Sequence, residues 1–220
     1  TFKETDQLIA SLEKQLYNEV FGQPATDQLD AGRMVQQLNQ IRDTLVYQHN
    51  GLFAGSVDNL VQKIKAFGLY YASLDVRQDS SVHQSFYSML VADTKLLPAE
   101  YDKMKEGDKL ALLSELAPLD KDIVFKDALH RDVIESVRVI ATIQEQNGET
   151  GCYRYIISQC NSAVNVMEVY GLFLLGGWKQ EALTIDIVPL FETIDDLRRA
   201  GSIMETLYTF PAYRKQLEKR

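Results

Sequence analysis

The chain has 220 residues, with 23 Lys and Arg against 31 Asp and Glu, so its formal net charge is −8. Hydrophobic residues make up 45% of it, which is ordinary for a globular protein and excludes a disordered chain. The acidic balance argues against a nucleic-acid-binding module, and no apolar run reaches the roughly 18 residues that a membrane span needs. Cys152 and Cys160 are too few for a disulfide framework, so we expect reduced, buried thiols in a cytoplasmic protein.

The first 67 residues are predicted to form three helices. Ser56 is a suitable N-terminal cap for the third helix. We therefore predict a helical segment over residues 1–55 and a second region over residues 56–220. Apolar residues recur at helical spacing in three sets: Leu8, Leu12, Leu16 and Val20; Met34, Leu38, Ile41 and Leu45; and Leu60, Val61 and Ile64.

From residue 56 onward, helix and strand patterns alternate. Residues 68–77, 153–158 and 184–190 are rich in β-branched, aromatic and other apolar residues and are predicted to be strands. Such alternation favours parallel strands joined by helical crossovers, so the predicted fold class is α/β, predominantly helical, with strands of a sheet or a partial barrel surrounded by helices. The helices are predicted at about 80–93, 110–116, 128–146, 163–175 and 192–208, with a short one from Pro211.

Polar side chains stand where each of the three predicted strands ends: Asp75, Arg77, Gln78 and Asp79 at the first, residues 158–161 at the second, and Glu192 after the third. Ligands of parallel α/β folds collect at the carboxyl ends of strands, so we single out Arg77, Gln78 and Glu192. Arginine offers a rigid fork of donors to phosphate or carboxylate, and a carboxylate is an ordinary ligand for Mg²⁺ or Mn²⁺. One arginine and one glutamate do not define a site, and the commoner outcome for such residues is to cap strands and pair with neighbours.

The histidines give a weaker signal. His49, His83 and His130 lack the spacing of metal ligands relative to one another. We expect each of them in a loop or on the surface of a helix.

Two segments resemble motifs of the phosphoenolpyruvate carboxylase family. Residues 67–83, FGLYYASLDVRQDSSVH, resemble the family's FGL…LDIRQES…H motif, and residues 188–197, VPLFETIDDL, resemble its VPLFET.DDL motif. The stretches 133–143 and 155–169 are similar to those that precede the second motif. The order and spacing agree, so the resemblance covers at least residues 56–218.

The departures from the family pattern are mostly small. Val76 and Asp79 replace the usual Ile and Glu, and Val82 stands where many members have Arg. The segment SQCNS at 158–162 differs more from the small-residue pattern of the family. Any role for Ser158 is therefore open.

The resemblance implies an activity and roles for the site residues. It implies that Arg77 contacts the substrate phosphate and the nascent carboxyphosphate, that Gln78 belongs to the same substrate-binding set, and that Glu192 is one of two protein carboxylates on Mg²⁺ or Mn²⁺. The implied reaction joins phosphoenolpyruvate and bicarbonate to give oxaloacetate and phosphate, which supplies the tricarboxylic acid cycle and fixes carbon dioxide. The implied fold is a parallel barrel among many helices, and the implied full-length protein is a cytoplasmic homotetramer.

Other motifs of the family are absent from this sequence. Its TAHPT histidine segment would lie upstream, and its GYSDS.KD segment with the second metal carboxylate and its GRGG loop would follow shortly after Arg220. We therefore expect a central piece of a longer enzyme, inactive by itself.

Two alternative functions stay open from the sequence. One is a non-catalytic helical domain that binds a partner through its first three helices, and the other is a different α/β metal enzyme that uses phosphoenolpyruvate. Arg77 and Glu192 at strand ends facing one pocket would favour an enzyme, because a helical interaction module does not need that arrangement.

Overall fold

The computed structural model describes residues 2–22, 29–70, 72–94, 96–120 and 123–220. The chain divides into two compact units, Thr1–Ser73 and Leu74–Arg220. The sequence placed this division after residue 55, whereas the structure places it 18 residues later. The reason is that the third helix packs against the second and contributes to the core of the first unit.

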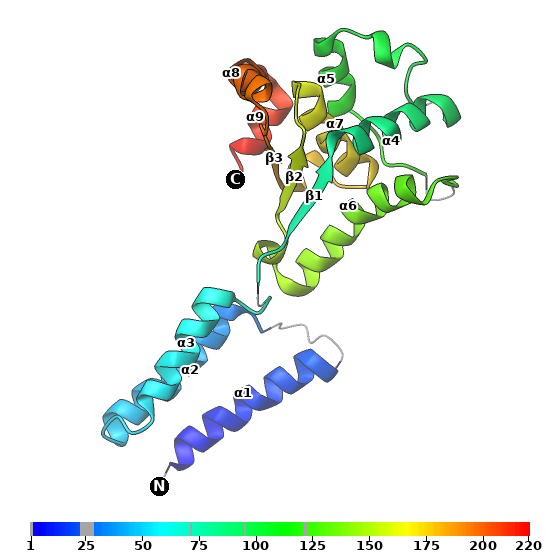
Figure 1. Ribbon diagram of the computed structural model, residues 1–220. Coiled ribbons are helices and arrows are strands. Elements are labelled where there is room, and N and C mark those ends of the chain that lie inside the picture. The colour runs from blue at the N-terminus through cyan, green and yellow to red at the C-terminus, as the bar shows by residue number, and fades with distance from the viewer. Residues whose placement is uncertain (1, 23–28, 71, 95, 121–122) are drawn as a thin grey trace. The chain divides into compact units, whose positions relative to one another are not determined.

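The first unit contains three helices in its described part, as the apolar spacing predicts (Figure 1). They are α1 (Lys3–Phe21), α2 (Ala31–Gln48) and α3 (Ala54–Phe67). Helix α3 begins two residues before the predicted cap Ser56, directly after Phe53, whose φ of 65° is left-handed. The apolar stripes of the three helices meet in one core formed by Leu12, Leu29, Met34, Leu38, Ile41, Leu45, Val61 and Ile64.

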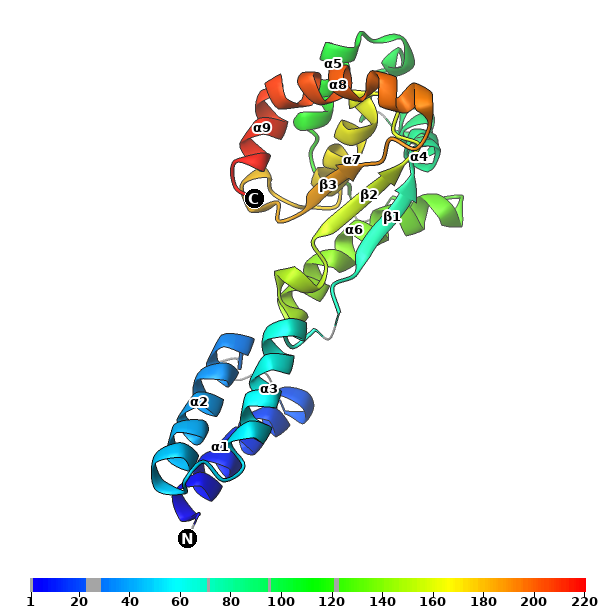
Figure 2. The same cartoon turned by 60° about the vertical axis from the view of Figure 1, so that its left-hand side comes forward.

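The second unit packs helices against a three-stranded parallel sheet (Figure 2). The strands are β1 (Asp75–Asp79), β2 (Arg154–Ser158) and β3 (Asp186–Pro189), and they lie in that order. The prediction of parallel strands in one sheet is confirmed. Within the described residues this sheet is open, so a closed barrel is not formed. The helices are α4 (Ser80–Asp93), α5 (Glu106–Ser114), α6 (Ala128–Asn147), α7 (Ala163–Leu175), α8 (Ile194–Thr209) and α9 (Pro211–Leu217).

Strand β1 differs from its prediction over 68–77. Residues 68–70 form a turn, in which Gly68 has a φ of 57°, and position 71 lies outside the described residues. The strand begins only at Asp75 because that is where pairing with β2 begins, at Arg154. It then continues through Asp79, two residues beyond the predicted end at residue 77.

The two faces of the sheet have different environments. Tyr155, Ile157 and Ile187 are buried, and Tyr155 contacts His83 of α4 and Phe173 of α7, so these residues lie on the face that the helices cover (Figures 1 and 2). Residues at alternating positions, such as Arg77 and Ile156, point to the opposite face and are partly exposed. Helix α7 is buried along nearly its whole length, which explains why its sequence is apolar on all sides.

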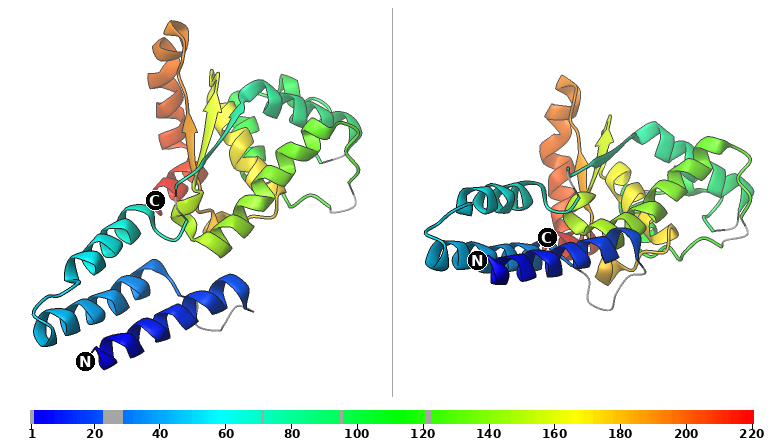
Figure 3. Two further views of the ribbon diagram at one scale, coloured as in Figure 1. Left: turned by 60° about the horizontal axis from the view of Figure 1, so that its bottom comes forward. Right: turned by 90° about the horizontal axis from the view of Figure 1, so that it is seen from below.

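Helices α8 and α9 lie along the β3 side of the sheet (Figure 3). The Tyr213 hydroxyl of α9 donates a hydrogen bond to the carbonyl oxygen of Ile187 at 3.4 Å, which ties α9 to β3. This contact fixes the last part of the chain beside the strand that precedes Glu192.

Three expectations about single residues and helices can be compared with the structure. Cys152 and Cys160 are buried and unpaired, as predicted. The prediction for His83 is wrong. It lies on α4 but is completely buried, because residues from other parts of the chain cover it. Among the described helices, none combines the length and apolarity needed to cross a bilayer.

Candidate active site at the ends of the strands

Arg77 and Glu192 meet at the carboxyl edge of the sheet. Arg77 lies on β1 and Glu192 follows β3, on opposite sides of β2 in the sheet. Nonetheless Nη2 of Arg77 lies 3.1 Å from Oε1 of Glu192. The two side chains therefore come together as predicted, although Arg77 is the third of the five residues of β1 and not its last.

This ion pair is open to solvent. The side chain of Arg77 is 57% exposed and that of Glu192 is 41% exposed. Exposed ion pairs of this kind stabilise a fold by only about 0–1 kcal/mol, because water screens the charges and two long side chains must be ordered. The fold therefore gains little from the pair, and both charged groups are accessible to a ligand.

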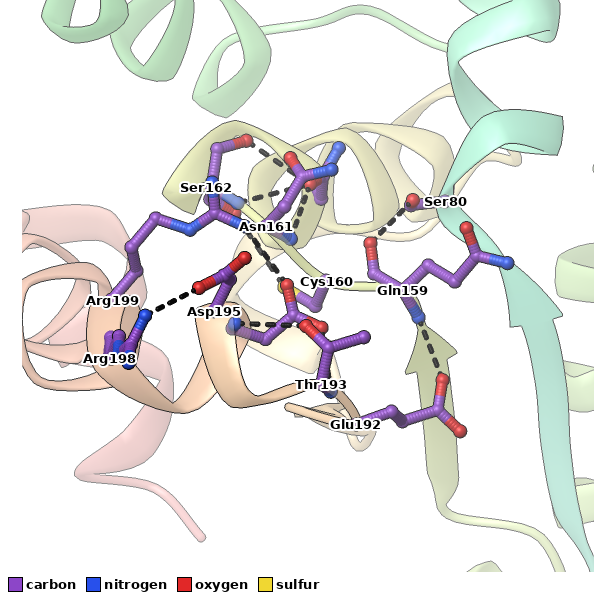
Figure 4. A network of polar contacts seen from close by, with 12 residues as sticks. Ser80, Gln159, Cys160, Asn161, Ser162, Glu192, Thr193, Asp195, Arg198 and Arg199 are labelled. Carbon is purple, nitrogen blue, oxygen red and sulfur yellow. Dashed lines mark hydrogen bonds and ion pairs between the residues drawn. The ribbon is translucent and has the colours of Figure 1, made fainter.

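The loop after β2 supplies a second contact to Glu192. The backbone N–H of Gln159 donates to Oε2 of Glu192 at 3.1 Å, while the Ser80 hydroxyl donates to the carbonyl oxygen of Gln159 at 2.9 Å (Figure 4). Gln159 has a φ of 53°, in the left-handed region. Residues that follow each of the three strands are thus linked in one chain of hydrogen bonds.

The start of α8 fixes the backbone directly after Glu192. The Thr193 hydroxyl accepts from the backbone N–H of Asp196 at 3.1 Å, and the Asp196 carboxylate accepts from the N–H of Thr193 at 3.0 Å. This reciprocal capping satisfies donors that a helix start leaves unpaired. Hydrogen bonds from the hydroxyl and the backbone N–H of Thr193 to the carboxylate hold the pKa of Asp196 below its ordinary value. The backbone around Glu192 is therefore anchored on both sides, by β3 and by α8.

Gln78 is not brought together with Arg77 and Glu192. Adjacent residues of a strand point to opposite faces, so Gln78 lies on the face that the helices cover. Its Oε1 accepts a hydrogen bond from the backbone N–H of Asp79 at 2.9 Å. Its assignment to the substrate-binding set stays a prediction.

Asp79 is a second carboxylate near this edge, but it has another task. Its Oδ1 accepts from the hydroxyl of Ser81 at 2.6 Å and from the backbone N–H of Ser81 at 2.8 Å, which caps α4. These hydrogen bonds hold the pKa of Asp79 below its ordinary value. Asp79 is thus ionised at neutral pH and used for the helix start.

The donor chemistry at the edge suits a divalent cation, although the set is incomplete. Glu192 accepts two hydrogen bonds, and a carboxylate has about four lone-pair positions, so it can also bind a cation. Mg²⁺ is commonly held by one or two carboxylates, with substrate oxygens and waters as its other ligands. Across the described ranges there is no cluster of three or more His, Cys, Asp or Glu side chains that could hold a metal. Because Asp79 is used for the helix cap, Glu192 is the candidate carboxylate for a cation at this edge.

The sequence places residues 158–161 at a strand end but does not predict that Ser80 contacts Gln159 there. Asp79 caps α4, and Ser80 is the first residue of that helix. A left-handed conformation at a glutamine leaves no pattern in the sequence. For both residues, the contact partners lie far away along the chain.

Sequence reasoning also missed a second polar group, Glu168, which is 3% exposed on α7. It lines a cavity of about 260 Å³ between α4, α5 and α7. Burial raises its pKa to about 7. The signal was present, because Glu168 is the only charged residue in the apolar sequence of α7.

Comparison with known proteins identifies relatives that match most of the chain. The sequence model of a family described as "Phosphoenolpyruvate carboxylase" matches residues 2–220. A phosphoenolpyruvate carboxylase of Trichormus variabilis is 34% identical over 182 residues, which are 77% of this chain and 18% of that protein. Those of Nitrosomonas eutropha and a Synechocystis species are 32% and 33% identical, over 87% and 88% of this chain and 21% and 19% of the relatives. The chain thus spans about a fifth of the length of these relatives.

Proposed function

The chain belongs to the phosphoenolpyruvate carboxylase family, and from this premise we propose that it forms part of an enzyme that carboxylates phosphoenolpyruvate with bicarbonate. Arg77 binds the phosphate of the substrate, and Glu192 provides one carboxylate ligand for Mg²⁺ or Mn²⁺. The observation that carries the proposal is the 3.1 Å approach of these two side chains, one from β1 and one from the segment that follows the carboxyl end of β3.

The proposed reaction transfers a phosphoryl group and then forms a carbon–carbon bond. An oxygen of bicarbonate attacks phosphorus, the bond from phosphorus to the enol oxygen breaks, and carboxyphosphate and the enolate of pyruvate form. Carboxyphosphate then releases phosphate and CO₂, and the enolate carbon attacks CO₂ to give oxaloacetate. The guanidinium of Arg77 supplies fixed donors to the phosphoryl oxygens while charge moves among them. A divalent cation, when bound, stabilises negative charge on the enolate oxygen.

Breaking the exposed ion pair when ligands bind costs little free energy. Without ligands, Arg77 and Glu192 neutralise each other. A phosphate at Arg77 and a cation at Glu192 give each group a new partner of opposite charge. Because an exposed pair is worth about 0–1 kcal/mol, this exchange costs little.

The parent protein supplies what this chain lacks. We propose that the open sheet is part of a parallel barrel in the parent protein, that the second metal carboxylate comes from elsewhere in that protein, and that the enzyme is a cytoplasmic homotetramer. Oxaloacetate made there would feed the tricarboxylic acid cycle. The alternative of a helical partner-binding domain is not favoured, because the family match extends through both units of the chain.

Replacement of Glu192 in the parent enzyme tests its role as a metal ligand. Glu192→Gln keeps the shape of the side chain but removes the charge that a hard cation requires. We expect turnover to fall by on the order of a hundredfold, because metal stabilisation of the enolate contributes several kcal/mol, and we expect the requirement for Mg²⁺ to rise. The measurement is turnover against Mg²⁺ concentration, with thermal unfolding in parallel.

The matched control is Asp195→Asn, which removes an exposed carboxylate three positions further on that pairs only with Arg198 among the described contacts. It should leave turnover and the metal requirement unchanged. Arg77→Lys keeps the charge but loses the fork of donors, so it should raise the KM for phosphoenolpyruvate and lower kcat. Near-normal turnover of Glu192→Gln with an unchanged metal requirement would show that Glu192 is not a ligand.

A further inference from the structure

Ser80 is buried at the site without touching Arg77 or Glu192 in any described contact. It is the first residue of α4, and its side chain is 3% exposed. Its hydroxyl donates to the carbonyl oxygen of Gln159, 79 positions along the chain, at 2.9 Å. Figure 4 shows this bond and the next one, from Gln159 to Glu192.

The helix start does not require the Ser80 hydroxyl. Asp79 caps α4, because its carboxylate accepts from the N–H of Ser81 at 2.8 Å. The hydroxyl of a serine in the first turn of a helix can often hydrogen-bond to water instead. Here the hydroxyl instead reaches the loop that follows β2.

Gln159 has a backbone conformation that depends on its partners. Non-glycine residues rarely have a φ near 53°, so contacts with the surroundings must hold this residue in place. Its carbonyl is held by Ser80, and its N–H is directed to Oε2 of Glu192. The other carboxylate oxygen, Oε1, contacts Arg77, so two donors fix the orientation of the carboxylate.

We propose that Ser80 is a positioning residue for Glu192. By holding the carbonyl of Gln159, Ser80 keeps the Gln159 N–H aimed at the carboxylate, and the carboxylate is thereby oriented before any cation binds. The consequence for metal affinity rests on the proposed function of Glu192. The hydrogen-bonded link from Ser80 through Gln159 to Glu192 does not depend on that proposed function.

The link is tested on the 220-residue chain itself, without metal, by hydrogen exchange of the Gln159 backbone amide measured by NMR. In Ser80→Ala we expect this amide to exchange about fivefold faster or more, since one hydrogen bond that orders the loop is lost. Glu192→Ala, which removes the acceptor, should accelerate the same amide. Ser88→Ala, at an exposed position of the same helix, should leave it unchanged, and the amide of Ile157 in β2 should not respond to any of the three.

A second variant covers the case in which Ser80→Ala does not fold. Ser80→Cys is close in size and keeps a weaker donor, so it should accelerate exchange of the Gln159 amide by a smaller factor. An unchanged exchange rate of the Gln159 amide in whichever of these variants folds overturns the proposal.

The consequence for metal binding is measured in the parent enzyme. Ser80→Ala should raise the Mg²⁺ concentration for half-maximal activity about fivefold while kcat changes by less than about twofold, because the ligand is still present but less well oriented. A residue with only a structural role would lower the unfolding temperature and leave that concentration unchanged. If Glu192→Gln also leaves the metal requirement unchanged, the proposed function fails. The exchange of the Gln159 amide then still decides the link.

Discussion

At the scale of single residues, two buried ionisable side chains stand out in the second unit. His83 is completely buried, and its Nε2 shares a hydrogen bond with the Tyr155 hydroxyl at 2.9 Å. Burial lowers the pKa of His83 from 6.5 to about 4. Burial also raises the pKa of the Glu168 carboxyl from 4.5 to about 7, although Asn165 and Tyr101 donate to it. Both side chains are thus held uncharged over part of the acidic range.

The two shifts have opposite effects on stability. The unfolded chain protonates His83 near pH 6.5, but the folded chain does so only near pH 4, so stability is lost as the pH falls through this window. The unfolded chain ionises Glu168 near pH 4.5, but the folded chain does so only near pH 7, so stability is lost as the pH rises through that window. Each effect amounts to on the order of 3 kcal/mol over its full window.

We therefore predict that the contributions of His83 and Glu168 largely cancel between pH 4.5 and 6.5. Relative to wild type, Glu168→Gln should become more stable as the pH rises, because the variant has no carboxyl to keep protonated. His83→Gln should become relatively more stable as the pH falls. The measurement is the free energy of unfolding in urea across this range.

An exposed glutamate provides the control for this pair of variants. Glu205→Gln on α8 should give a free-energy profile parallel to that of wild type. If the profiles of Glu168→Gln and His83→Gln are also parallel to wild type, the two buried groups do not titrate as inferred.

At the scale of elements, close packing on α7 depends on Gly171. A Cβ atom at this position would lie 2.7 Å from the Tyr87 hydroxyl oxygen of α4 and 3.0 Å from the carbonyl oxygen of Leu113 in α5. Distances this short require neighbouring atoms to move. Gly171 thus allows α4 and α5 to approach the buried helix α7 that supports the sheet.

We predict that Gly171→Ala destabilises the chain by about 1–3 kcal/mol, although alanine is the better helix former. The matched control is Gly201→Ala in α8, where no atom lies within 4 Å of the added Cβ. There the gain in helix propensity should stabilise the chain by about 0.5–1 kcal/mol. Free energies of unfolding of both variants check this, and stabilisation by Gly171→Ala would contradict the packing argument.

At the scale of the whole chain, the two units have separate apolar cores, and the candidate site belongs to one of them. Arg77, Gln159 and Glu192, together with Ser80, all lie in Leu74–Arg220. The chain spans about a fifth of the length of its relatives, and its described residues contain no cluster of three or more side chains that could hold a metal. Groups that act together in catalysis lose nearly all activity when one is missing.

We therefore predict that the 220-residue chain by itself forms no oxaloacetate above the level without protein. The assay couples oxaloacetate to malate dehydrogenase and contains phosphoenolpyruvate, bicarbonate and Mg²⁺. The parent enzyme at the same concentration is the positive control. Steady oxaloacetate formation by the chain would show that its own residues complete the site.

The sequence by itself determined the local elements and the two charged site residues. The apolar run at 163–175 predicted α7 with the bounds that the structure has, and the alternation of patterns predicted parallel strands. The motifs around Arg77 and Glu192 predicted which side chains would meet. These features follow from periodicity and from residue types close together along the chain.

Only the tertiary structure decided where β1 begins, which face Gln78 occupies and how deeply His83 is buried. It also decided that Gln159 adopts a left-handed conformation held by Ser80. The physical reason is common to all of these. Strand pairing, burial and the hydrogen bonds of a loop depend on residues up to about a hundred positions away. A local sequence pattern contains no information about which distant residues make these contacts.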